Sequence, residues 1–309
     1  MTQNNTSIPG LHHVTAISGP PQANVDFFTR VLGQSLVKKT VNFDDPGTYH
    51  LYYGDATGSP GTILTFFPFA DAGPGRAGPG MASAYAYSVP EGEFDAWMER
   101  LAEQAIDFDG PEMRFGSRVI ILRDPDGAPV ELVETTRSAD GPTDGFHSVT
   151  LWQDDIAPTA RLLTDVFGYE EIGHEAADGT ERLRLQAPGD APGSVVDLLR
   201  SDESSIGRQG AGTIHHVAFR ALDDTNQLEW RERVASSGLN VTPVIDRQYF
   251  NAIYFREPGG VLFEIATDPP GFAVDEAPTA LGQKLMLPPK YEPIRERIER
   301  ALPPIETAP

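Results

Sequence analysis

The chain has 309 residues with 45 acidic and 24 basic side chains, and its formal net charge of −21 argues against nucleic-acid or anionic membrane partners. The absence of cysteine excludes disulfides and thiolate metal sites, which leaves histidine and carboxylates for any metal chemistry. Because no apolar run approaches the ~20 residues of a membrane span and residues 1–9 lack a signal-peptide pattern, we expect a cytoplasmic protein.

The first predicted strand, GLHHVTAI at residues 10–17, carries the doublet His12–His13 among apolar and β-branched residues. PQANVDFFTRVLG at 21–33 follows with helical periodicity and ends in glycine, and GTILTFF at 61–67 closes the unit as a strand. Only seven histidines occur in the chain, yet the sequence TIHHVAFR at 213–220 contains a second doublet, His215–His216. A repeated doublet in the same setting indicates an internal repeat.

The succession of strand, helix and closing strands occurs four times along the chain. First strands are predicted at 10–17, 83–90, 145–152 and 213–220, and helices at 21–33, 93–104, 157–168 and 226–238. Alignment of the units places His13, Ala84, Ser148 and His216 at one position of the first strands. It places Thr65, Glu131, Asp197 and Glu264 at one position of the last strands. The two positions are 47 to 52 residues apart in every unit.

This arrangement resembles the vicinal oxygen chelate superfamily (glyoxalase, bleomycin resistance protein, extradiol dioxygenase), whose βαβββ modules pair into curved sheets around a metal cleft. The resemblance implies an α+β fold in which four βαβββ modules form two curved, mixed β-sheet clefts. We expect the N-terminal pair of modules in residues 1–139 and the C-terminal pair in 145–272, with DGPTDG (140–145) as a linker. The segment 69–81 is a predicted loop, and 273–309 is a tail with one short helix that wraps the protein or forms an interface.

Only one pairing of modules, the first with the fourth, assembles two histidines and a carboxylate at the aligned positions. These residues are His13, His216 and Glu264, with Thr65 in the fourth place. Two histidines and one carboxylate form the triad typical of non-haem Fe(II) oxygenases, while Mn(II) or Zn(II) remains an alternative by ligand type. Thr65 provides no second acidic ligand, which glyoxalase- and epimerase-type members of the superfamily generally use.

The remaining candidate ligands lack such partners. Glu131 and Asp197 have no histidines at the aligned positions, so we interpret them as structural carboxylates. His50 and His174 stand alone in the sequence and are interpreted as surface residues. His147 aligns with the first members of the doublets, and a competing triad that uses it stays open.

Three stretches together resemble one branch of the superfamily. They are GLHHVTAI, DRQYFNAIYFREPGGVLFEIATDPPGF (246–272) and LMLPPKYEPIRERIERALPPI (285–305). The branch that they resemble comprises ring-cleaving dioxygenases acting on hydroquinones, including the chlorohydroquinone and methylhydroquinone 1,2-dioxygenases. In that branch one histidine of the first module and a histidine and glutamate of the fourth bind iron, which matches the pairing above. The resemblance also implies polar residues near the substrate: His12, His215, Thr15, Arg247 and Tyr254.

Strand alternation conflicts with part of this assignment. In a regular strand His12 points away from the face that carries His13 and Thr15, and the same holds for His215 and His216. A β-bulge, a strand end or a role in orienting the ligands would resolve the conflict.

The sequence therefore predicts an Fe(II)-dependent dioxygenase that inserts O2 into a hydroquinone-type ring, with a small aromatic molecule and O2 as its partners. Three alternatives remain open at this point. They are a catechol-type extradiol dioxygenase, a glyoxalase-type isomerase or lyase that needs a metal without consuming O2, and a non-catalytic binding module. The complete triad disfavours the binding module. The apolar face of the tail helix predicts a homo-oligomer.

Overall fold

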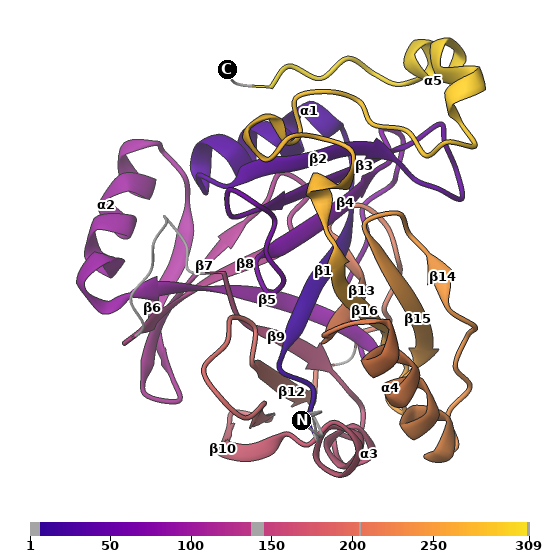
Figure 1. Ribbon diagram of the computed structural model, residues 1–309. Helices are drawn as coiled ribbons and strands as arrows, with labels where there is room; N and C mark the ends of the chain where they lie inside the picture. The colour runs from indigo at the N-terminus through magenta and orange to yellow at the C-terminus, as the bar shows by residue number, and fades with distance from the viewer. Residues whose placement is uncertain (1–6, 137–144, 204, 308–309) are drawn as a thin grey trace.

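The computed structural model describes residues 7–136, 145–203 and 205–307 (Figure 1). Within these ranges the chain forms sixteen strands in two eight-stranded mixed sheets, together with five α-helices. The linker residues 140–144 and the N-terminal residues 1–6, on which two of the expectations fall, lie outside the described ranges. None of the helices in these ranges is long and apolar enough to cross a membrane.

All four predicted units are βαβββ modules. The first contains β1 (Leu11–Ser18), α1 (Pro21–Asp26), η1 (Phe27–Val31), β2 (Ser35–Val41), β3 (Tyr49–Gly54) and β4 (Ile63–Pro68). The second contains β5 (Met81–Pro90), η2 (Glu91–Glu93), α2 (Phe94–Glu103), β6 (Phe108–Arg114), β7 (Ser117–Arg123) and β8 (Pro129–Thr135). The third contains β9 (Phe146–Trp152), α3 (Ala157–Arg161), η3 (Leu162–Val166), β10 (Glu170–Ala177), β11 (Thr180–Gln186) and β12 (Val195–Ser201). The fourth contains β13 (Thr213–Ala221), α4 (Asp224–Ser236), β14 (Ile245–Asp246), β15 (Phe250–Arg256) and β16 (Leu262–Pro270).

The modules pair in space as the positions of the candidate metal ligands predict. One sheet has the strand order β14-β15-β16-β13-β1-β4-β3-β2 and joins the first module to the fourth. The other has the order β10-β11-β12-β9-β5-β8-β7-β6 and joins the second to the third. The two halves of the chain, 1–139 and 145–272, therefore each contribute one module to each sheet.

The strand register confirms the fourfold alignment. In every module the first strand runs parallel to the last, and the aligned position of the last strand pairs two residues beyond that of the first. The pairs are Thr15 with Thr65, Ala86 with Glu131, Thr150 with Asp197, and Ala218 with Glu264. Residues that are aligned in the sequence thus occupy equivalent places in the four modules of the structure.

The helices of the first and third modules end in the same unusual way. α1 and α3 continue into the π-turns η1 and η3, where the amides of Leu32 and Phe167 donate to carbonyls five residues earlier. Gly33 and Gly168 follow with φ of 70° and 75°, a left-handed conformation that favours glycine at a helix end. The two predicted helices are therefore confirmed, with a wider last turn than the sequence indicated.

The tail packs over the first module (Figure 1). It contains the short turns η4 (Phe272–Val274), η5 (Pro278–Ala280) and η6 (Glu292–Ile294) and the helix α5 (Arg295–Ala301). Leu285 forms a bridge with Lys39 of β2, and the Tyr49 hydroxyl donates to the carbonyl of Pro303. The tail thus wraps the protein, as one of the two expectations for it stated.

A buried ion cluster fastens the beginning of the tail. The fully buried Lys38 of β2 places its Nζ 2.6 Å from Asp275 Oδ1 and 2.5 Å from Glu276 Oε2, and it lies 4.9 Å from the centre of the Tyr249 ring. The Tyr249 hydroxyl donates to the same aspartate over 3.0 Å. Because both carboxylates are largely shielded from water, the lysine charge is what permits their burial.

We predict that Lys38→Met lowers the free energy of unfolding by about 3 kcal/mol, because it leaves two shielded carboxylates without a counter-charge. Denaturant unfolding measures the change. Lys284→Met removes an exposed lysine of the same tail region and serves as the control, with an expected change below about 0.5 kcal/mol. Equal, small effects of the two substitutions would contradict this account of the tail.

Candidate metal centre

The side chains of His13, His216 and Glu264 meet at the centre of the sheet shared by the first and fourth modules. His13 lies on β1, His216 on the adjacent β13 and Glu264 on β16, and all three side chains are buried. The Nε2 atoms of the two histidines are 3.3 Å apart, and they lie 3.4 and 2.9 Å from Glu264 Oε2. Among the described residues this is the one group of three or more such side chains with converging ligand atoms.

The spacing of the three atoms fits a single divalent cation. Two ligand atoms at about 2.1 Å from one ion are separated by about 3.0 to 3.4 Å, close to the observed 2.9 to 3.4 Å. Neither carboxylate oxygen of Glu264 accepts a hydrogen bond of acceptable geometry from the described residues, although the side chain is fully buried. A buried carboxylate without donors, facing two imidazole nitrogens, is a metal-binding triad rather than a polar network.

The electrostatics keep Glu264 and His216 in the protonation states that a metal requires. Burial alone would raise the pKa of Glu264, but His13 and His216 hold it well below its usual range. Burial lowers the pKa of His216 despite the neighbouring glutamate. The glutamate is therefore ionised and His216 neutral at neutral pH, and both have lone pairs to donate.

β-Bulges place the first member of each doublet beside the second. In the pairing of β1 with β13, Leu11 and His13 oppose the adjacent residues Phe219 and Ala218, so that His12 is the extra residue of a bulge. Likewise His216 and Ile214 oppose adjacent residues of β1, and His215 is extra. The bulges bring His12 Nδ1 to 2.9 Å from His13 Nδ1, and His215 Nδ1 to 2.8 Å from His216 Nδ1. Of the three possibilities considered, the β-bulge therefore resolves the conflict with strand alternation.

His12 and His215, the first residues of the two doublets, differ in whether their second ring nitrogen can reach the cavity. If the Nε2 atoms of His13 and His216 bind a metal, their Nδ1 atoms carry the protons and donate to His12 and His215, whose own protons then lie on Nε2. His12 does not line the cavity. His215 lines the cavity, so its Nε2–H is available there. Burial lowers the pKa of both, that of His215 to about 4.

A cavity of about 640 Å³ opens on the triad. Aromatic and aliphatic side chains form much of its wall, among them Ile17, Phe67, Phe69, Phe250 and Leu262. Arg247 and Tyr254 also line it. The Arg247 Nε donates to the Tyr254 hydroxyl over 3.2 Å, and its Nη1 lies 3.1 Å from the exposed carboxylate of Asp44. Burial and the nearby Glu264 raise the pKa of Tyr254 well above its usual value, so its hydroxyl stays protonated.

Thr15 and His50 belong to one hydrogen-bonded chain. The Thr15 hydroxyl lies 2.8 Å from that of Thr65, which lies 2.8 Å from His50 Nε2, and His50 Nδ1 lies 2.8 Å from the Tyr52 hydroxyl. Thr15 does not reach the cavity, whereas His50 and Tyr52 line it. The interpretation of His50 as a surface residue was wrong. No other module has a histidine at the position equivalent to His50, so alignment of the modules could not identify it.

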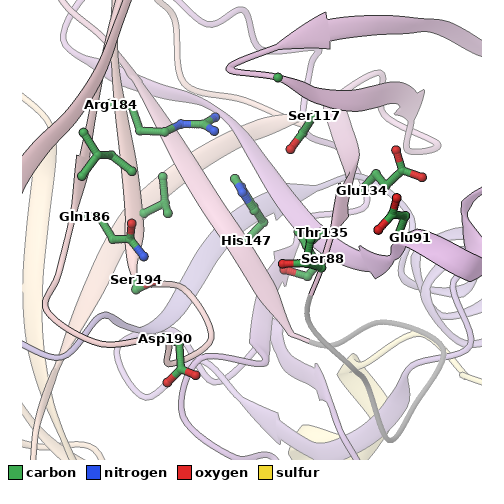
Figure 2. A pocket seen from close by; sticks show the side chains of 14 residues that line it. Ser88, Glu91, Ser117, Glu134, Thr135, His147, Arg184, Gln186, Asp190 and Ser194 are labelled. Carbon is green, nitrogen blue, oxygen red and sulfur yellow. The ribbon is translucent and has the colours of Figure 1, made fainter.

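The cleft of the second and third modules carries arginine in place of a metal triad. The buried Glu131 lies 2.7 Å from Arg114, and Asp197 accepts two hydrogen bonds of 2.8 Å from Arg184. Burial alone would raise the pKa of Asp197, but the arginines hold it below its usual range. Figure 2 shows this cleft, with Arg184 and His147 among the residues that line it. The prediction of structural carboxylates is confirmed, and His147 contacts Ser148 rather than the triad. His174 is exposed, as predicted.

Comparison with known proteins agrees with this geometry. The family model described as the Glyoxalase/Bleomycin resistance protein/Dioxygenase superfamily matches residues 10–132 and 145–265. The chain is 47% identical over 308 residues to a Bacillus subtilis protein that is named as the ring-cleaving dioxygenase MhqO, covering 96% of each chain. It is 33% identical to the chlorohydroquinone/hydroquinone 1,2-dioxygenase of Sphingobium indicum, covering 98% of each.

Solved structures support the same fold. The crystal structure of a dioxygenase from Bacillus subtilis superimposes with a TM-score of 0.90 at 46% identity, covering 98% of this chain and 99% of the other. Glyoxalase I from Zea mays superimposes with a TM-score of 0.64 at 14% identity, covering 84% and 92%. The second likeness shows the fold alone.

We predict that Glu264→Ala weakens binding of a divalent metal by more than about 100-fold, beyond the loss typical of residues that merely support ligands. The matched variant Glu131→Ala retains metal binding. It lowers the free energy of unfolding by about 3 kcal/mol, because Arg114 loses its buried partner. Metal content after dialysis and denaturant unfolding measure the two effects. Equal metal contents in the two variants would show that the triad is misplaced.

Proposed function

The chain belongs to the glyoxalase/bleomycin resistance protein/dioxygenase superfamily, and we propose that it is a ring-cleaving dioxygenase that opens hydroquinone-type rings at an Fe(II) centre. The observation that carries the proposal is the triad of His13, His216 and Glu264. Thr65 occupies the fourth aligned position, and its hydroxyl is hydrogen-bonded to Thr15 and His50 and adds no carboxylate ligand. His13, His216 and Glu264 would hold the metal. A triad leaves positions open for substrates, as in non-haem Fe(II) oxygenases, and Mn(II) is the alternative ion.

Bound Fe(II) supplies one-electron redox chemistry between an aromatic diol and O2. The protein's own contribution is to bind and orient the ring, exclude water and hold protons. The mostly apolar cavity wall accepts the ring, and Phe250 lies 5.0 Å from the His13 ring, centre to centre. A para-diol has no vicinal hydroxyl and cannot chelate, so its orientation depends on side chains of the cavity.

Tyr254 and Arg247 would act on the oxygen that binds beside Glu264. Because the Arg247 Nε donates to the Tyr254 oxygen, the tyrosine O–H is left to donate elsewhere. Tyr254 pairs with Glu264 across β15 and β16, which places its side chain next to the carboxylate on the same face of the sheet. The two residues would hold a proton near the reacting oxygen and stabilise the negative charge that develops there.

The doublet residues and Thr15 would have separate roles. His215 would donate its Nε2–H to a ring or oxygen atom in the cavity while it orients His216. His12 would only orient His13, since it does not line the cavity. Thr15 would hold Thr65 and thereby the wall of the cleft. A cytoplasmic location and a homo-oligomer formed through the tail helix stay predictions of the sequence.

The main prediction concerns oxygen consumption. After anaerobic reconstitution with Fe(II), the protein should take up O2 with methylhydroquinone and chlorohydroquinone. Uptake with catechol should be slower, because Tyr254 and Arg247 would orient a single hydroxyl of the substrate. An oxygen electrode measures the uptake, and Glu264→Ala is the inactive control. Iron-loaded protein that consumes no O2 with any of the three substrates contradicts the proposal and favours a glyoxalase-type isomerase or lyase.

A second prediction separates the doublet residues. His12→Phe should weaken metal binding by about 10- to 100-fold and leave kcat near that of the native protein once Fe(II) is saturating. His215→Phe should also lower kcat at saturating Fe(II), by about 100-fold, because it removes a proton donor from the cavity. Activity titrated against Fe(II) measures both. Indistinguishable titrations would mean that the two histidines act alike.

A further inference from the structure

The cavity has a second polar wall, formed by His50 and Tyr52 of β3. Both side chains line the cavity opposite Tyr254 of β15 and Arg247, which directly follows β14. The rings of His50 and Tyr52 are 4.1 Å apart, and His50 is held on its other side by Phe67 at 4.3 Å. Both nitrogens of His50 are engaged, Nδ1 by the Tyr52 hydroxyl and Nε2 by the Thr65 hydroxyl. His50 is therefore fixed in the wall, and the Tyr52 hydroxyl is the group with capacity to spare.

The internal repeat relates Tyr52 to Tyr254. Tyr52 pairs across the strands with Thr65, and Tyr254 pairs with Glu264 in the same register. Since Thr65 and Glu264 occupy equivalent positions, the two tyrosines face the cleft from opposite sides. Tyr254 stands beside the metal ligand, whereas Tyr52 stands on the side where the ligand is replaced by threonine.

The hydrogen-bonding capacity of Tyr52 is open in either tautomer of His50. If His50 Nδ1–H donates to the tyrosine oxygen, the tyrosine O–H can donate into the cavity. If the tyrosine donates to Nδ1, its oxygen can still accept. The direction of the hydrogen bonds from Thr15 through Thr65 to His50 is thus coupled to what Tyr52 offers.

We propose that the Tyr52 hydroxyl binds the ring hydroxyl that does not reach the metal, with His50 as the residue that positions it. This inference rests on the proposed function, because it takes the substrate to be a para-diol. A hydroxyl carried into a mostly apolar cavity loses its bonds to water, and leaving it without a partner weakens binding. Tyr52 is suited to supply that partner because Tyr254 and Arg247 are already placed on the side of Glu264.

The test is the affinity ratio of two ligands measured without oxygen. Hydroquinone and phenol share the hydroxyl beside the metal and differ in the remote one. Calorimetry on anaerobic Fe(II)-loaded protein should show tighter binding of hydroquinone. Tyr52→Phe should weaken hydroquinone binding by about 5- to 10-fold and change phenol binding by less than about twofold. His50→Phe should reduce the same ratio by a smaller factor, because Tyr52 remains but loses its fixed direction.

Tyr53→Phe is the matched control. Tyr53 is the next residue on β3, its hydroxyl donates to Asn24, and it does not line the cavity, so the affinity ratio should not change. Equal weakening of both ligands by Tyr52→Phe, or no weakening, would overturn the assignment. O2 uptake by the same native preparation tests the proposed function separately. Uptake with hydroquinone together with an unchanged ratio in Tyr52→Phe would refute the role of Tyr52 alone.

Discussion

The antiparallel pairing of β1 with β13 is the constraint on which the site depends. It joins residues about 200 positions apart in the chain and brings His13 and His216 to neighbouring strands. Each strand carries a one-residue bulge at its doublet, so the second histidine points into the cleft while the first hydrogen-bonds to it from the side. Without both bulges, strand alternation would place the members of each doublet on opposite faces of the sheet.

Much of the fold and the triad could be predicted because the chain repeats itself. Equivalent positions in four modules reduce a search over all histidines and carboxylates to eight residues, and only the pairing of the first and fourth modules assembles a metal-binding set. The strand order confirms that pairing. Arg247 and Tyr254, which the family resemblance implied, also lie in the cavity.

The rest depends on contacts that a local pattern does not contain. A bulge is a property of two paired strands, so alternation within β1 alone could not show that His12 contacts His13. His50 lay outside the reach of the repeat because its counterpart on β15 is Ala252, as the registers of Tyr52 and Tyr254 show. It could have been found from the chain alone only by placing β3 next to β4 and asking which of its side chains face Thr65.

The two clefts share one repeated framework and differ in the groups that lie next to their buried carboxylates. Both contain a buried carboxylate at the aligned position of a last strand. In the second cleft, Arg114 of β6 binds Glu131 and Arg184 of β11 binds Asp197. Among the described residues no arginine pairs with Glu264, so its burial is stabilised when a cation joins it, His13 and His216. The absence of arginine is thus as necessary to the metal centre as the presence of histidine.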